Sequence, residues 1–282
     1  MAGAQDRFRP MHEAHSIEQV VITVRFDRPL TDEAIRSADE TMSSLQDALP
    51  RRDSIQGMAF QVGPQGMMPI APPIIDVPNG IARTRTDNGG ALIKDLRIDR
   101  QSINFRTFEY TRWEAVWTEA REYFGSLLPR LGETNIAAYA LSYVDKFVWT
   151  GPRETCRPTS LLKSGSLYVS PASFDADDLW HCHSGRFISA NGHTKRLEAV
   201  NIDCVDENDI TGITPQFVRV VRISTTLTDF LNQQGFSPYD LPVIDAIGYL
   251  DDAAQDLHSS LKSMFGAIVN DDTADQVGLN AS

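Results

Sequence analysis

The clearest pattern near the start of the chain is an alternation of apolar and polar residues over residues 17–26. A period of two is typical of a strand with one face buried. The apolar face carries Val20, Ile22, Val24 and Phe26. After Pro29 the spacing of apolar residues changes to three and four, and Thr31 is a suitable N-cap. The pattern therefore predicts a strand over 17–26 and then a helix that ends at Pro50.

Two longer apolar stripes follow at helical spacing. The first begins at Trp113 and reaches Leu131, and Gly132 ends it. The second predicts a helix over residues 242–269. Its stripe is made of Ile244, Ile247, Leu250, Ala254, Leu257, Leu261, Met264 and Ile268.

Most of the remaining pattern is typical of strands. We expect them near residues 54–62, 81–87, 91–98, 102–109, 136–149, 165–170, 178–189, 195–205 and 216–227. Strands in runs with few helices between them indicate an α+β fold, in which three long amphipathic helices pack on one face of mainly antiparallel sheets. Alternating parallel units are missing from the pattern, so a doubly wound nucleotide-binding fold is not expected.

The order of elements suggests two similar halves. Residues 1–16 are predicted to be a flexible N-terminal segment, and residues 17–150 an N-terminal α+β half. Residues 151–270 form the expected C-terminal α+β half, because the polar, proline-containing stretch that starts at 151 reads as a boundary. Residues 271–282 are expected to be a frayed acidic tail.

Charge changes this picture, because the net charge of −12 is unevenly spread over the 282 residues. Residues 171–282 hold 17 acidic and 6 basic residues. An acidic half repels phosphate backbones, so extensive nucleic-acid binding is not expected.

Residues 81–112 are the exception, since they carry seven bases and four acids. The bases are Arg83, Arg85, Lys94, Arg97, Arg100, Arg106 and Arg112. They form either a solvated strand face or an anionic contact surface, for which the first five are the candidates. That surface would meet nucleic acid or the acidic half of a second copy of the chain.

The most metal-like stretch is His181-Cys182-His183. On a strand both imidazoles point to one face, while Cys182 points to the other. A third ligand would come from a neighbouring strand, and the candidates are Asp203, Glu198 and His193. The alternative is a solvated sheet face that carries two histidines. Two ligands without a spaced third do not define a zinc site.

Two other residues are candidates for catalysis. Asp145 falls on the aromatic face of strand 136–149, where an unpaired buried carboxylate would cost several kcal/mol. We expect it to pair with a basic group or to reach solvent. His258 lies beside the apolar stripe of the last predicted helix, where most histidines make a local hydrogen bond.

Four stretches of the chain occur in an order that resembles a known family. They are SIEQVVITVRF (16–26), Tyr110 with Trp113, ALSYVDKF (140–147) and LHSSLKSMFGAIVND (257–271). The chain is similar in these to a sporadically distributed family of uncharacterised bacterial and archaeal proteins. Its members carry an I-x-E-x-V strand, a Y-x-x-W helix start, an R-Y-x-N strand and an L-H helix near the C-terminus. The resemblance implies an architecture and no established activity.

The chain departs from that family at two places. His15 and Ser16 stand where a proline precedes the first strand, and Ser142-Tyr143-Val144-Asp145 stands for R-Y-x-N.

No phosphate-binding loop, dinucleotide fingerprint or nucleophile elbow occurs in the sequence, so no cofactor is expected. The three cysteines form no C-x-x-C pair, and no signal peptide or membrane span is expected, all of which suits a reducing cytoplasm. The sequence thus favours a non-enzymatic binding or regulatory protein that acts through protein–protein contacts or as a homo-oligomer. The alternatives are a metal-dependent enzyme centred on His181 and His183, and nucleic-acid contact through residues 81–112.

Overall fold

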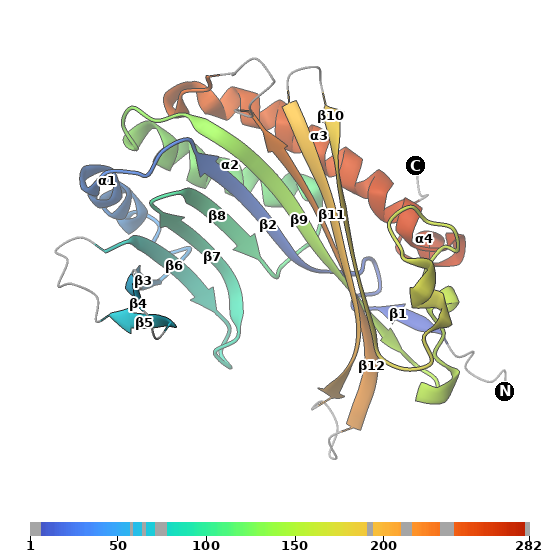
Figure 1. Cartoon of the computed structure of the whole chain (residues 1–282). Coiled ribbons are helices and arrows are strands. Elements are labelled where there is room, and N and C mark those ends of the chain that lie inside the picture. The colour runs from blue at the N-terminus through green and yellow to red at the C-terminus, as the bar shows by residue number, and fades with distance from the viewer. Residues whose placement is uncertain are drawn as a thin grey trace. The chain divides into compact units, whose positions relative to one another are not determined.

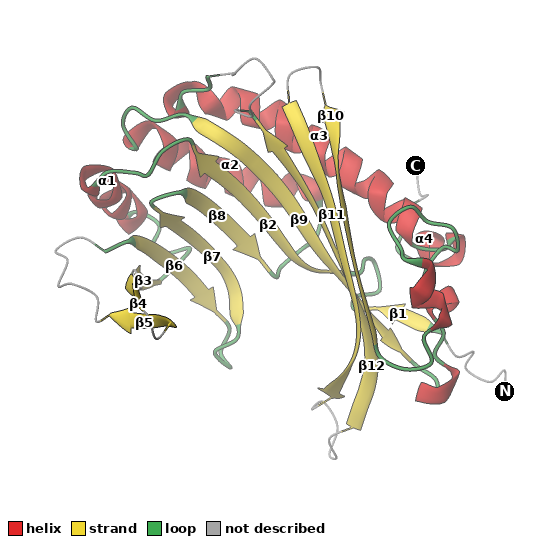
Figure 2. Ribbon diagram, in the orientation of Figure 1, coloured by secondary structure: helices red, strands yellow, loops and turns green. Residues whose placement is uncertain are grey.

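The structure is a computed structural model of the chain (Figures 1 and 2). It describes residues 7–56, 59–63, 66–70, 78–190, 194–209, 216–231 and 240–279. Among these residues the chain combines strands and helices in an α+β fold, as the sequence predicts (Figure 2).

The strands are β1 (Phe8–Pro10), β2 (Ile17–Phe26), β3 (Arg51–Ile55), β4 (Ala59–Gly63), β5 (Gly66–Ile70), β6 (Gly80–Thr86), β7 (Leu92–Asp99), β8 (Ser102–Thr107), β9 (Ile136–Trp149), β10 (Trp180–Ala190), β11 (Thr194–Asp209) and β12 (Gln216–Phe230). The α-helices are α1 (Asp32–Ser43), α2 (Trp113–Leu127), α3 (Ala246–Ile268) and α4 (Asp271–Gln276). Short 3-10 helices include η2 (Arg153–Thr155), η4 (Pro171–Asp175) and η5 (Val243–Asp245).

Ten of the strands form a sheet in the order β10-β11-β12-β9-β2-β8-β7-β6-β3, with β1 added on β9. The hairpin pairs β10–β11, β6–β7 and β7–β8 are antiparallel, as are β3–β6 and β1–β9. Strands β4 and β5 form a separate antiparallel pair.

The chain divides into two compact units whose segments interleave along the sequence. Unit 1 consists of residues 1–20, 140–229 and 254–282, and unit 2 of residues 21–139 and 230–253. The expected division into sequential halves near residue 150 is not what the structure shows, because β2, β9 and β12 each contribute residues to both units.

Unit 2 shows how local sequence sets its elements. The Thr31 hydroxyl caps α1 by accepting a hydrogen bond from the Ala34 N–H at 3.2 Å. In the β6–β7 turn one Asp87 carboxylate oxygen accepts from the N–H groups of Gly89 and Ala91, both at 2.8 Å, and Gly90 takes a positive φ of 86°. These are the contacts that asparagine, aspartate and glycine make in tight turns.

The core of unit 1 contains the aromatic face of β9 and the apolar stripe of α3. Phe147 and Leu257 are almost fully buried, and the Phe147 ring stacks on Phe265 with centroids 6.3 Å apart. The predicted stripe is wrong at its first residue. Ile244 lies in η5, before α3 begins, and is 64% exposed.

Three further expectations about the elements need correction. Residues 165–170 form no strand, since this stretch is a series of turns before η4. The first predicted helix of the chain ends at Ser43, short of Pro50, although Leu49 is still buried. The C-terminal stretch is not frayed over 271–276, because the Asn270 side chain caps α4 by accepting from the Thr273 N–H at 2.9 Å.

The N-terminal segment is also partly ordered. Residues 8–10 form β1 and pair with residues 147–149 of β9. Residues 1–6 lie outside the described residues.

Candidate functional site

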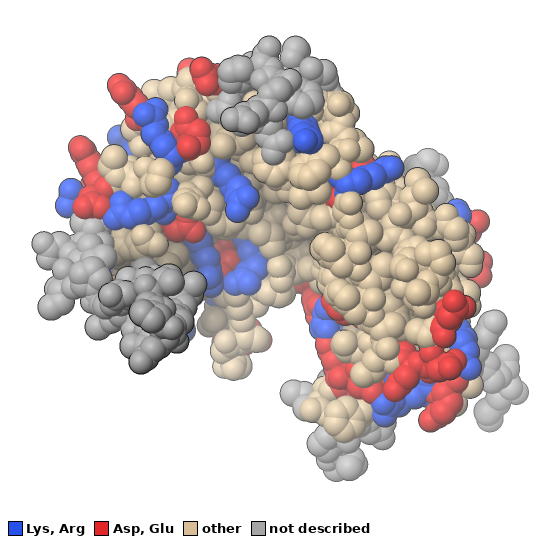
Figure 3. All heavy atoms as spheres, viewed as in Figure 1, with Lys and Arg blue, Asp and Glu red and all other residues tan. Residues whose placement is uncertain are grey.

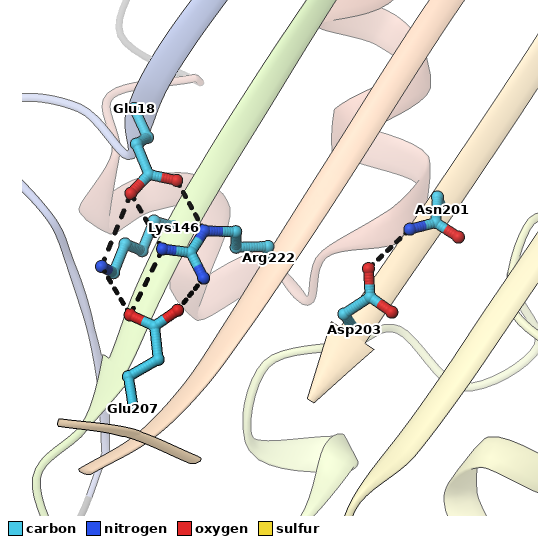
Figure 4. Close-up of polar contacts among 6 residues, drawn as sticks. All are labelled: Glu18, Lys146, Asn201, Asp203, Glu207 and Arg222. Carbon is cyan, nitrogen blue, oxygen red and sulfur yellow. Dashed lines mark hydrogen bonds and ion pairs between the residues drawn. The ribbon is translucent and has the colours of Figure 1, made fainter. Parts of the chain in front are cut away.

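Four charged side chains meet on one face of unit 1, one from each of four neighbouring strands (Figure 4). Arg222 of β12 binds Glu18 of β2 through Nε at 2.6 Å and Nη2 at 3.0 Å, and it also binds Glu207 of β11. Lys146 of β9 donates to Glu207 at 2.9 Å and lies 3.5 Å from Glu18. We call these four residues the ion network.

The electrostatics of the ion network favour the charged forms of Glu18, Glu207 and Arg222. Burial raises the pKa of Glu18, but hydrogen bonds and charge interactions with Arg222 and Lys146 outweigh it, so the pKa lies below its usual value. The hydrogen bond from Arg222 likewise lowers the pKa of Glu207, and Glu18 in turn raises the pKa of Arg222. Carboxylates with lowered pKa values are poor general acids at neutral pH. The network is therefore suited to holding strands and presenting fixed charges.

The candidate metal ligands lie on the same face of β10 and β11. His181 Nδ1 is 2.6 Å from Asp203 Oδ1, and Asn201 donates to the other Asp203 oxygen at 2.6 Å (Figure 4). His183 pairs in register with Asn201, two residues along each strand from the His181–Asp203 pair. Among the described residues, no three His, Cys, Asp or Glu side chains gather as a metal site.

The other proposed ligands do not join this group. Glu198 accepts hydrogen bonds from Arg186 at 2.6 Å and from the Tyr168 hydroxyl at 3.0 Å. His193 lies outside the described residues. Cys182 is buried while the histidines on either side of it are exposed, as the strand period predicts.

The basic segment 81–112 is largely neutralised by ion pairs within unit 2. Lys94 of β7 binds Glu119 of α2 at 3.0 Å. Arg97 and Arg106 both bind Asp95, each at 2.7 Å, and Asp95 is almost fully buried. On the face seen in Figure 3, basic and acidic side chains are intermingled.

The remaining bases of that segment have varied surroundings. Arg100 binds Asp32 at 2.5 Å. Arg83 is buried, and its Nη2 donates to Ser43 at the C-terminal end of α1, where the helix dipole favours a cation. Arg85 is exposed. The five candidate residues therefore do not make a continuous free basic surface.

Asp145 is buried, with 4% of its surface exposed, and its polar contact is the Ser16 hydroxyl, which donates at 2.7 Å. Burial raises its pKa to about 7, and the Ser16 hydrogen bond opposes this only in part. The expectation of a basic partner is wrong, since among the described residues no Lys, Arg or His forms an ion pair with it. His258 is half-buried, and its Nδ1 lies 2.9 Å from the Tyr143 hydroxyl.

Strand β10 lies at one end of the strand order of the sheet. The sequence pattern predicts the strand but not this position at the edge. Strand β10 is 11 residues long, and its register with β11 is continuous from Trp180 to Ala190. Phe187 is 52% exposed on it, and Lys195 Nζ lies 4.6 Å from the centre of that ring. Its single full charge, Arg186, is paired with Glu198 at 2.6 Å.

No protein-family model matches the sequence, and a search of curated proteins also finds no match. Within the described part of the chain, no helix has both the length and the apolar character that crossing a membrane requires.

Proposed function

We propose that this chain is a non-enzymatic cytoplasmic binding or regulatory protein that acts through protein–protein contacts made by the free edge of β10. The observation that carries the proposal is the long, charge-poor edge strand in the sheet order. We infer that the partner at this edge is a second copy of the chain.

An edge strand presents a row of backbone N–H and C=O groups that another strand can pair with. Proteins that stay monomeric commonly protect such strands with lysine, proline or a bulge. Strand β10 contains neither lysine nor proline, and its pairing with β11 runs without a shift over 11 residues. The exposed Phe187, together with Leu179 just before the strand, adds apolar surface beside this row.

Charge supports self-pairing in particular. Two copies of one strand can pair antiparallel about a two-fold axis, so that each contributes the same residues. Like charges that meet across such a pair would oppose it. In β10 the only full charge is Arg186, which Glu198 already neutralises within the same copy. Two β10 strands therefore meet without strong repulsion between their side chains.

Other observations support the rest of the proposal. The bases of segment 81–112 are mostly engaged in ion pairs, which favours protein contacts over nucleic-acid contacts. All three cysteines are free thiols, in keeping with a reducing cytoplasm. Membership of the sporadically distributed family belongs to the same proposal, and Trp113 at the start of α2 and His258 within α3 suit its motifs.

The proposal is tested by adding charge to the edge. Phe187 and Ser189 are both exposed, and the double variant Phe187→Lys/Ser189→Lys gives β10 the lysines that protected edges carry. In sedimentation velocity we expect the unmodified chain to be a dimer at micromolar concentration and the double variant to be a monomer.

The matched control is Ile244→Lys, an exposed apolar residue in η5 replaced in the same way. It should leave the dimer intact. A monomeric unmodified chain, or a double variant that still dimerises, would refute pairing at β10.

A further inference from the structure

A buried carboxylate in unit 2 is shared by two arginines. Asp95 of β7 has 1% of its surface exposed. Arg97, two positions along the same strand, donates to it from Nε at 2.7 Å, and Arg106 of β8 donates from Nε at 3.1 Å and from Nη2 at 2.7 Å. Asp95 lies directly opposite Arg106 in the register, so all three side chains are on one face of the sheet. We call these three residues the Asp95 cluster.

The Asp95 cluster contains one more positive charge than negative charge. The ion network of unit 1 is balanced, since two cations there meet two carboxylates. In the Asp95 cluster a single carboxylate faces two guanidinium groups. Within the described part of the chain, no second acidic side chain forms an ion pair with Arg97 or Arg106. The cluster therefore holds a positive charge in excess at a fixed place on the sheet.

The neighbours on this face of the sheet do not cancel the excess charge. Arg51 and Asp53 of β3 share the face, two strands away from the cluster, and they bind each other at 2.9 Å. Thr84 of β6 lies between these two groups and is buried and uncharged. On the other side, the residue opposite Arg97 is the uncharged Asn104. An anion at the cluster would therefore meet a net positive surface.

The two guanidinium groups are fixed in place and still accessible. The side chains of Arg97 and Arg106 are 48% and 29% exposed. Asp95 uses only Nε of Arg97 and two of the three nitrogens of Arg106, so both Nη groups of Arg97 and Nη1 of Arg106 are not used by that carboxylate. Arg106 also lies over the Phe108 ring, 5.6 Å from its centre. Guanidinium groups that are already oriented lose little side-chain entropy when they bind an anion.

We propose that the Asp95 cluster binds the phosphate group of a small molecule through Arg97 and Arg106. Guanidinium groups match the spacing of phosphate oxygens. A phosphate monoester presents three such oxygens, so it can bridge the two arginines from the solvent side while Asp95 bridges them from the buried side. The ligand is a small molecule because the net charge of −12 repels a long chain of phosphates. The site lies in unit 2, so it does not depend on pairing at β10.

The test is to titrate the full-length protein with inorganic phosphate and to follow the arginine Nε–H signals by NMR, with chloride adjusted to keep the ionic strength constant. We expect the signals of Arg97 and Arg106 to shift and to saturate with a Kd of about 1 mM, as a few charge-assisted hydrogen bonds allow. Acetate has one charge and two oxygens, and it should bind about tenfold more weakly because it forms fewer such bonds. Equal affinity for acetate and phosphate would overturn the assignment of the ligand.

Arg97→Gln is the decisive variant, because it leaves Arg106 and Asp95 as a balanced pair and the buried carboxylate keeps its cation. It should weaken phosphate binding about tenfold or more. Arg51→Gln is the matched control, since it removes a base from the same face of the sheet, and it should leave the affinity unchanged. An unmodified chain that shows no saturable binding, or equal losses in the two variants, would refute the site.

A second measurement uses stability and not affinity. Asp95→Asn removes the carboxylate that the two arginines share, so bound phosphate becomes the anion between them. Phosphate should therefore raise the Tm of Asp95→Asn more than the Tm of the unmodified chain, when both are compared with chloride at equal ionic strength. Equal shifts in the two proteins would contradict phosphate binding by these arginines.

Discussion

The two ends of the strand order, β3 in unit 2 and β10 in unit 1, differ in length and in charge. Strand β3 has five residues and carries Arg51, Arg52 and Asp53, whereas β10 has 11 residues and one full charge. Charged, short edges resist pairing with another chain, and long uncharged ones invite it. The contrast teaches that one sheet can protect one of its edges and leave the other available.

Long-range polar contacts occur in both units. In unit 2, Trp117 and Arg121 both donate to Asp251, which lies 134 and 130 positions away. In unit 1, Arg222 binds Glu18 across 204 positions. Contacts of this reach form only when distant segments have come together.

The largest effect should come from the core of unit 1. Leu257→Asp places a charge at a site that is 1% exposed on α3, and we expect it to lower the free energy of unfolding by about 3–5 kcal/mol. The same exchange at Leu167, which is 82% exposed in the same unit, should have little effect. Urea unfolding of both variants measures the difference. Equal midpoints would mean that the apolar stripe of α3 does not pack into unit 1.

A smaller effect on stability is expected at two buried carboxyl groups, Asp145 in unit 1 and Asp95 in unit 2, which have different partners. The folded-state pKa of Asp145 is raised from 3.8 to about 7. The native state therefore holds a proton that the unfolded state releases, and this stabilisation is complete below the ordinary pKa and lost as pH rises through about 7. We expect the urea midpoint to fall between about pH 5 and about pH 8.

Asp145→Asn mimics the protonated carboxyl and should flatten that pH dependence, which raises stability at the alkaline end. Asp95→Asn should instead lower stability across the same range, because it leaves two arginines without their carboxylate. A pH profile unchanged by Asp145→Asn would show that Asp145 is not the titrating group.

A substitution in the ion network should change the free energy of unfolding less than the substitutions at the buried residues Leu257, Asp145 and Asp95. Arg222→Ala leaves Lys146 to balance both Glu18 and Glu207, and we expect a loss of about 1–3 kcal/mol for this half-buried group. Arg52→Ala in unit 2 breaks a more exposed pair with Asp39 and should cost less than about 1 kcal/mol. If the two losses, measured by urea unfolding, are alike, the ion network stabilises unit 1 no more than an exposed ion pair stabilises unit 2.

The smallest effect tests whether charge is what protects β3. Arg51→Thr/Arg52→Thr, introduced together with the two β10 lysine substitutions, removes the basic residues from the shorter edge. We expect weak self-association to reappear in sedimentation velocity, with stability within about 1 kcal/mol of the starting variant. A strictly monomeric product would indicate that the short length of β3 is protection enough.

Much of the local structure follows from residues close together in the sequence. The period of two gave β2 its boundaries at Ile17 and Phe26, and the Thr31 cap marked the start of α1. These features are predictable because the atoms that decide them lie within a few residues of one another. The prediction erred at residues 165–170, where an apolar stretch meets turn residues and packing decides between strand and loop.

The sequence by itself thus determined the α+β class, most elements and the opposite orientation of Cys182 and its neighbouring histidines. Only the tertiary structure decided that β10 is an edge, that Ser16 is the partner of Asp145, and that Arg222 meets Glu18. The reason is physical: an edge is a property of which strands pair, and a contact across many positions exists only once the intervening chain has folded. Periodicity records which face of an element is buried, but it holds no information on what lies against that face.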